Sequence, residues 1–180
     1  MKEVEFPPFS IGNHKIEEKE YEKMLRACRH EISAFFRKKY GISPSKLSWD
    51  RPVEGEVPLE CLMEATIYRI KARMDSYILA VEEGVLSSPD LTNLIQRMQE
   101  ENKKRKEACL QGNVIYGLAE FSFETYLAYE EDALEKIYCH DHKTDHAGYL
   151  QKLEETGRKN KIQVNRKDLY EFTLQQTGFS

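Results

Sequence analysis

The spacing of apolar residues between positions 58 and 83 constrains the fold more than any other feature of the sequence. Apolar side chains recur there every three or four residues from Leu59 to Val81, which is the period of one face of an α-helix. Pro58 is a favoured first residue of a helix, and Gly84 follows the last apolar position. The pattern predicts one long amphipathic helix over residues 58–83.

The same kind of spacing predicts five further helices. They are expected over residues 17–40, 91–111, 123–140, 144–158 and 165–176. Before the first of them, residues 9–16 carry a Gly12-Asn13 pair between two short apolar pieces, which predicts a small strand or hairpin. The sequence has only 9 Gly and 6 Pro, which argues against an all-β fold rich in turns.

These patterns together predict an all-α fold with a short N-terminal strand or hairpin. We expect a helical domain over residues 1–140 and a helical C-terminal extension over residues 141–180. The connection over residues 42–57 is long for a compact domain, and it contains Trp49, the single tryptophan. We expect Trp49 to fix this connection by packing onto the helices.

Composition and charge argue against several classes of protein. The net charge is -4, without the basic surface typical of nucleic-acid-binding proteins. No segment approaches the roughly 18 uncharged apolar residues of a membrane span. The N-terminus lacks the apolar stretch of a signal peptide. The expected location is therefore cytoplasmic as the sequence stands, or extracytoplasmic if a signal peptide was removed.

The sequence contains no motif typical of catalysis. A Gly-rich phosphate loop and a G-x-S-x-G turn are both missing, so we expect no enzyme. Residues 139–146 combine Cys, His and Asp, which are metal-binding types, with His142 and His146 as weak candidate ligands. The segment lies where a helix should end, so we interpret it as a polar helix end and expect no metal or cofactor. Paired carboxylates such as Glu130-Glu131 are interpreted as solvated helix surface.

Two polar residues continue the apolar line of the helix predicted over residues 91–111. Asn102 and Arg105 follow Leu94 and Met98 on that line. Polar side chains on a buried face usually bond to backbone groups of a neighbouring irregular segment. Residues 113–122 break the helical period and are the nearest such segment, so a structural role is predicted for Asn102 and Arg105.

Residues 9–21 read Phe-Ser-Ile-Gly-Asn-His-Lys-Ile-Glu-Glu-Lys-Glu-Tyr, which is a strand, a turn, a strand and an acidic helix start. Further stretches follow in a characteristic order: Phe35-Phe36, Tyr40-Gly41, Trp49, Gly55-Glu56-Val57-Pro58, Gly84, Glu101-Asn102, Arg105, Ile115-Tyr116-Gly117, Phe121 and Tyr126. Across residues 9–140 the sequence thereby resembles the N-terminal domain of SurA-type and PrsA-type foldases, and in particular a Gram-positive branch of that group.

The resemblance implies a helical domain that cradles unfolded or extended polypeptide and assists its folding outside the cytoplasm. Such foldases often carry a parvulin-type prolyl isomerase domain with its own sheet. Residues 141–180 are too few and too helical for such a domain, so isomerase activity is not expected here.

The sequence leaves two functions open. The first is a chaperone-like domain that holds unfolded polypeptide without catalysis of its own. Flexible Met and aromatic side chains would accept many client sequences, and the candidates are Trp49, Met98, Tyr116, Phe121, Phe123 and Tyr126. Each of them has core packing as its alternative. The second function is a helical assembly protein that binds one specific partner or itself.

Overall fold

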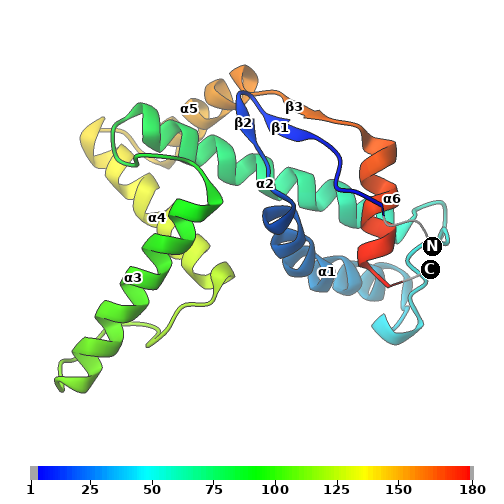
Figure 1. The fold of residues 1–180 in the computed structure, drawn as a ribbon, viewed down its shortest axis with the longest axis horizontal. Helices are drawn as coiled ribbons and strands as arrows, with labels where there is room; N and C mark the ends of the chain where they lie inside the picture. The colour runs from blue at the N-terminus through cyan, green and yellow to red at the C-terminus, as the bar shows by residue number, and fades with distance from the viewer. Residues whose placement is uncertain (1–3, 179–180) are drawn as a thin grey trace. The chain divides into compact units, whose positions relative to one another are not determined.

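The protein is mostly helical in the computed structural model, which describes residues 4–178 (Figure 1). Its helices are α1 (Glu18–Tyr40), α2 (Pro58–Glu82), α3 (Leu91–Leu110), α4 (Phe123–Asp141), α5 (His146–Lys159) and α6 (Arg166–Gln176), with a single 3-10 turn, η1 (Pro44–Lys46). Each predicted helix is confirmed, with ends that differ by at most two residues. No helix within residues 4–178 is both long and apolar enough to cross a lipid bilayer.

The predicted all-α class is wrong in one respect, because the chain also forms a small β-sheet. Its strands are β1 (Phe9–Ile11), β2 (His14–Lys15) and β3 (Ile162–Val164), in the order β2-β1-β3. The hairpin of β1 and β2 was predicted from the turn at Gly12-Asn13. The antiparallel pairing of β1 with β3 joins segments about 150 residues apart, and a three-residue strand has no period that sequence analysis could detect.

The described residues form two compact units. We call residues up to Ala72 together with those from Lys159 onward the terminal unit, and residues 73–158 the central unit. Helices α4 and α5 thus lie in the central unit, whereas β3 and α6 belong to the terminal unit. The predicted division at residue 140 stays a prediction.

The terminal unit contains the sheet, α1, α6 and the first part of α2. Its core includes an aromatic cluster in which the ring centroids of Tyr21 and Phe172 lie 6.1 Å apart. The hydroxyls of Tyr21 and Thr173 form a buried hydrogen bond of 2.6 Å. Trp49 is only 3% exposed, and its carbonyl accepts a hydrogen bond from the Leu59 backbone at the start of α2. The long connection is therefore fixed at Trp49.

The central unit contains the second part of α2, α3, α4 and α5, and the first three of these meet around one buried carboxylate. Glu130 on α4 is 7% exposed. It accepts hydrogen bonds from Arg97 on α3, Tyr77 on α2 and Tyr126 on α4. The interpretation of Glu130 as solvated helix surface is therefore wrong, because its partners come from two other helices.

Candidate functional site

The most exposed large apolar side chains of the described residues lie at the end of α3 and just after it. Leu110 and Val114 are each 80% exposed, and Tyr116 is 89% exposed. Leu118 and, on α4, Tyr129 are also exposed. We call these five residues the arm surface. Exposed large apolar side chains that gather in one region can mark a binding site, so this surface is the first candidate for one.

Val114, Tyr116 and Leu118 lie in residues 111–122, which have no regular secondary structure. We call these residues the arm segment, or the arm. Side chains of α3 hold this segment in place. Arg105 donates from Nη1 to the carbonyls of Tyr116, at 3.1 Å, and Leu118, at 2.8 Å. Asn102 donates to the Phe121 carbonyl at 3.0 Å and accepts from the Phe121 amide at 2.7 Å. These are the backbone bonds to residues 113–122 that the sequence indicated for the pair. The exposed side chains therefore project from an anchored backbone.

Aromatic rings form the floor of this region. Phe121 is buried, and its ring lies 5.6 Å from the ring of Tyr126 and 4.9 Å from that of Tyr129. The guanidinium of Arg105 stacks over Phe121 at 4.6 Å, which is a cation–π arrangement. Arg105 thus contacts both the backbone of the arm segment and the rings beneath it, so Tyr116, Leu118 and Tyr129 surround one anchoring side chain.

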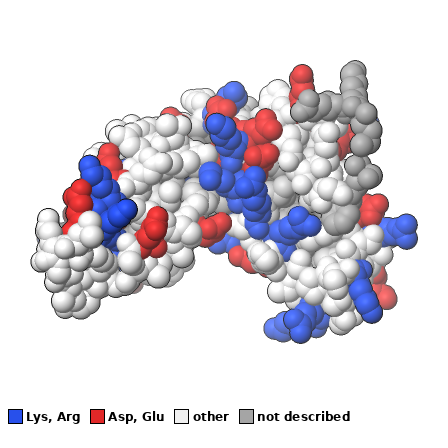
Figure 2. Space-filling model, turned by 60° about the horizontal axis from the view of Figure 1, so that its bottom comes forward, with Lys and Arg blue, Asp and Glu red and all other residues white. Residues whose placement is uncertain are grey.

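Figure 2 shows mostly uncharged surface in the part of the view that contains α3 and the segment after it, crossed by a narrow row of charged residues. On α3, Lys103 forms an ion pair with Glu107, and Arg105 pairs with Glu101. Acidic residues flank the basic ones there, so the local charge nearly cancels. The apolar side chains, rather than net charge, distinguish this surface.

Burial, together with the carboxylate of Glu130, keeps two neighbouring tyrosines protonated. Burial, and next the negative charge of Glu130, raise the pKa of Tyr77 and that of Tyr126 well above their ordinary value of 10.0. Both phenols stay protonated at neutral pH and donate to Glu130 at 2.5 Å and 3.1 Å. Helices α2 and α4 are therefore joined through the carboxylate of Glu130.

The structure separates the six residues that the sequence named as candidates for peptide binding. Tyr116 is exposed in the arm surface, and Met98 is half-buried on α3. Phe121, Phe123 and Tyr126 are buried in the central unit, and Trp49 is buried in the terminal unit.

Sequence reasoning did not single out four members of the arm surface, Leu110, Val114, Leu118 and Tyr129. The available signal was a series of apolar residues that follows the polar end of α3 without a helical period. Such a series also fits buried segments, so exposure could not be read from it.

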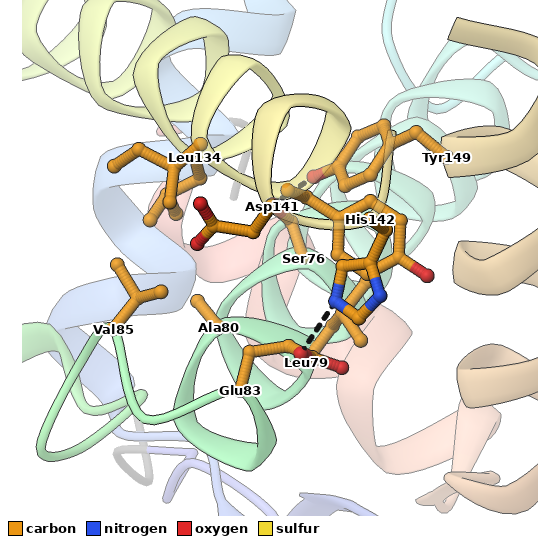
Figure 3. Close-up of a pocket in the computed structure, with 11 residues that line it drawn as sticks. Ser76, Leu79, Ala80, Glu83, Val85, Leu134, Asp141, His142 and Tyr149 are labelled. Carbon is orange, nitrogen blue, oxygen red and sulfur yellow. Dashed lines mark hydrogen bonds and ion pairs between the residues drawn. The ribbon is translucent and has the colours of Figure 1, made fainter. Parts of the chain in front are cut away.

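The histidines considered as weak metal ligands pair with separate carboxylates. His142 Nε2 lies 2.7 Å from Glu83 Oε2, as Figure 3 shows, and His146 Nδ1 lies 2.6 Å from Glu135 Oε1. Within residues 4–178, no group of three or more His, Cys, Asp or Glu side chains could hold a metal ion.

The small pocket beside His142 is lined by side chains that contact one another. The His142 ring stacks on Tyr138 with centroids 4.2 Å apart. On another side of the pocket, the hydroxyls of Ser76 and Tyr149 hydrogen-bond at 3.0 Å (Figure 3). The pair of His142 with Glu83 links the end of α4 to the end of α2, and the bond of Ser76 with Tyr149 links α2 to α5. The residues around this pocket therefore pack three helices of the central unit together.

Together, these features describe a mostly helical protein with an anchored, exposed apolar surface. The chain is 32% identical over 136 residues to a protein of Bifidobacterium longum subsp. longum described as a chaperone for lacto-N-biosidase. The aligned region is 76% of this chain and 49% of that relative, so the chain spans about half of its length. No family model matches the chain, and no solved structure matches it.

Proposed function

We propose that this chain is a chaperone-type protein that holds apolar segments of a client polypeptide on the arm surface and has no catalysis of its own. The observation that carries the proposal is the exposure of Tyr116, Val114 and Leu110 at 80% or more. Burial of an exposed apolar side chain by a partner is favourable, by about 1.5–3 kcal/mol for each large side chain that becomes fully buried.

The anchoring of the arm suits this role. Arg105 and Asn102 fix the backbone of the arm segment before a client arrives, so binding does not have to order it. Preorganised binding surfaces retain more of their contact free energy as affinity. A client segment would then cover side chains that already point outward.

The similarity to a chaperone supports the same function. That relative is described as serving one enzyme, lacto-N-biosidase, and we propose that this chain likewise serves a particular client, with an enzyme of that kind as the first to test. The resemblance to the N-terminal domain of SurA-type and PrsA-type foldases adds to the proposal, because it implies binding of unfolded or extended polypeptide.

Refolding of a client tests this proposal. Denatured lacto-N-biosidase is diluted with and without an equimolar amount of this chain, and the recovered activity is measured. We expect the chain to raise the recovery, and the double variant Tyr116→Ser with Leu118→Ser to lose most of that gain. An aromatic side chain at the centre of an interface commonly contributes about 1–2 kcal/mol or more to binding.

A matched control distinguishes binding at the arm surface from non-specific binding through any exposed apolar side chain. Tyr68 is 76% exposed on α2, outside the arm surface. The variant Tyr68→Ser removes a comparably exposed ring and should support refolding as well as the unchanged chain does. Equal loss in both variants, or no gain from the unchanged chain, would contradict the proposal.

A further inference from the structure

The outer edge of β3 is a second candidate for binding, and it lies in the terminal unit. In the sheet order β2-β1-β3, β3 is an edge strand that, among residues 4–178, pairs with β1 alone (Figure 1). The register places Ser10 opposite Gln163 and Ile11 opposite Ile162, so Gly12 faces Lys161. The Gly12 amide donates to the Lys161 carbonyl at 2.9 Å. Gly12 and Lys161 are therefore a hydrogen-bonded pair.

The alternation of antiparallel pairing then fixes which backbone groups face outward. Hydrogen-bonded and non-hydrogen-bonded pairs alternate along such a ladder, so Ser10 and Gln163 bond to each other. The backbone groups of Ile162 and Val164 point away from β1. The pairing on the other side of β1 supports this assignment. Phe9 is opposite Val164, and its carbonyl points away from β3, because it accepts a hydrogen bond from the Ile16 amide next to β2.

The stretch around this edge is basic. Residues 158–167 contain five Lys or Arg residues and no Asp or Glu, although the whole chain has a net charge of -4. Arg158 pairs with Glu154 and Arg166 with Glu64. The exposed lysines at 159, 161 and 167 have no carboxylate partner within the described part of the chain. Positive charge is thus available beside an unpaired strand edge.

We propose that the outer edge of β3 binds an extended, acidic peptide segment, which adds to the sheet as a fourth strand. The amides and carbonyls of Ile162 and Val164 would supply its backbone hydrogen bonds, as in other cases of strand addition. Lysines beside an edge strand disfavour pairing with other strands, whereas opposite charges on paired strands stabilise them, so the lysines that flank β3 select an acidic segment. A second copy of this chain would bring the same basic stretch against itself and is disfavoured for the same reason.

The side chains of β3 define the sequence pattern of such a segment. Ile162 and Val164 are half-buried, whereas Lys161 and Gln163 are exposed on the opposite face together with the Ser10 hydroxyl. Directly opposed side chains on one face of a sheet interact. The segment should therefore alternate acidic residues, which oppose Lys161, with β-branched apolar residues, which extend the face of Ile162 and Val164.

Binding of a designed peptide to the full chain tests this proposal. The probe is a fluorescein-labelled, acetylated eight-residue peptide of alternating Glu and Val, followed by fluorescence anisotropy. We expect saturable binding, and new protection of the Ile162 and Val164 amides in hydrogen exchange. The same peptide with Lys in place of Glu should not bind. A peptide N-methylated at alternate residues on its bonding edge loses its hydrogen bonds to the carbonyls of both Ile162 and Val164. It should bind about 25- to 100-fold more weakly, because each lost hydrogen bond reduces affinity by about five- to tenfold.

Two variants of the chain locate the site. Val164→Pro removes one outward amide and leaves the bonds of β3 to β1 in place, whereas Val164→Ile keeps both the amide and a β-branched apolar side chain and serves as the matched control. Lys161→Glu reverses the nearest charge. We expect Val164→Pro and Lys161→Glu to weaken binding about tenfold and Val164→Ile to leave it unchanged.

Several results would overturn the proposal. They are no binding of the acidic peptide, equal binding of the N-methylated peptide, or a concentration-dependent dimer that protects the same two amides. If Val164→Pro does not fold, the N-methylated peptide on the unchanged chain decides the question alone. Because the arm surface takes no part in these measurements, their outcome is independent of the refolding experiment.

Discussion

Arg97 donates two hydrogen bonds to Glu130, from Nε to Oε1 at 2.6 Å and from Nη2 to Oε2 at 3.0 Å. This bidentate pair joins α3 to α4. The carboxylate also accepts from the Tyr77 hydroxyl at 2.5 Å, so α2 belongs to the same network. Planar pairs of this kind carry geometric specificity as well as energy, and this one fixes α3 against α4 within the central unit.

Replacement of the buried carboxylate should therefore destabilise the protein. Glu130→Gln leaves the cation of Arg97 without its partner, and breaking a buried pair from one side costs about 3–5 kcal/mol, less where one partner is partly exposed as here. We expect a loss of about 2–3 kcal/mol in the free energy of unfolding, measured in urea. Asp132→Asn breaks only the exposed pair with Lys136 and should change it by less than about 1 kcal/mol.

The anchoring of the arm segment should be visible in local hydrogen exchange. Asn102→Ala removes the acceptor of the Phe121 amide and the donor to its carbonyl. We expect faster exchange at Phe121 and its neighbours, and a loss of about 1–3 kcal/mol of stability. Lys104 on the same helix is exposed and forms no hydrogen bond or ion pair with residues 4–178, so Lys104→Ala should leave exchange unchanged. Unchanged exchange in Asn102→Ala would contradict the anchoring role.

The buried tyrosines predict a loss of stability at alkaline pH. Burial raises the pKa of Tyr77 and that of Tyr21 above their ordinary value of 10.0. Above that pH the unfolded chain releases protons that the folded chain keeps, so the free energy of unfolding falls as pH rises. Urea titrations should show a decline that begins near pH 10, reduced in Tyr77→Phe. A Tyr77→Phe variant that declines as steeply as the unchanged protein would argue against this assignment.

The packing of Trp49 should contribute to the stability of the terminal unit. Trp49 is 3% exposed, and Arg29 lies over its ring at 5.3 Å. Trp49→Ala should lower the free energy of unfolding by about 3–5 kcal/mol, the usual range for a buried aromatic side chain. The exposed-ring control Tyr68→Ala should change it by less than about 0.5 kcal/mol. A small effect of Trp49→Ala would mean that the connection over residues 42–57 is fixed by other contacts.

The sequence predicted those features that depend on local period and position. The helices followed from apolar spacing, and the bonds of Asn102 and Arg105 to residues 116–121 followed from polar side chains on an apolar line. Glu130 was misread because its partners Arg97 and Tyr77 approach from helices more than 30 residues away in the chain. A lone acidic pair in a sequence does not reveal such partners.

Two further features were outside the reach of sequence patterns. Strand β3 is too short to show an alternation, and its partner β1 lies at the other end of the chain. The exposure of Leu110 and Val114 depends on the path that the backbone takes after α3. A run of apolar residues looks the same in sequence whether it is buried or exposed.

Site-specific crosslinking tests the central claim, that the arm surface contacts client polypeptide, most directly. A photoreactive residue is placed by Tyr116→benzoylphenylalanine, and in a control chain by Tyr68→benzoylphenylalanine. Each chain is irradiated with denatured lacto-N-biosidase as it is diluted from denaturant, and the crosslinked adduct is measured. We expect an adduct from position 116 and little from position 68. Equal adducts from both positions, or none from position 116, would contradict the account.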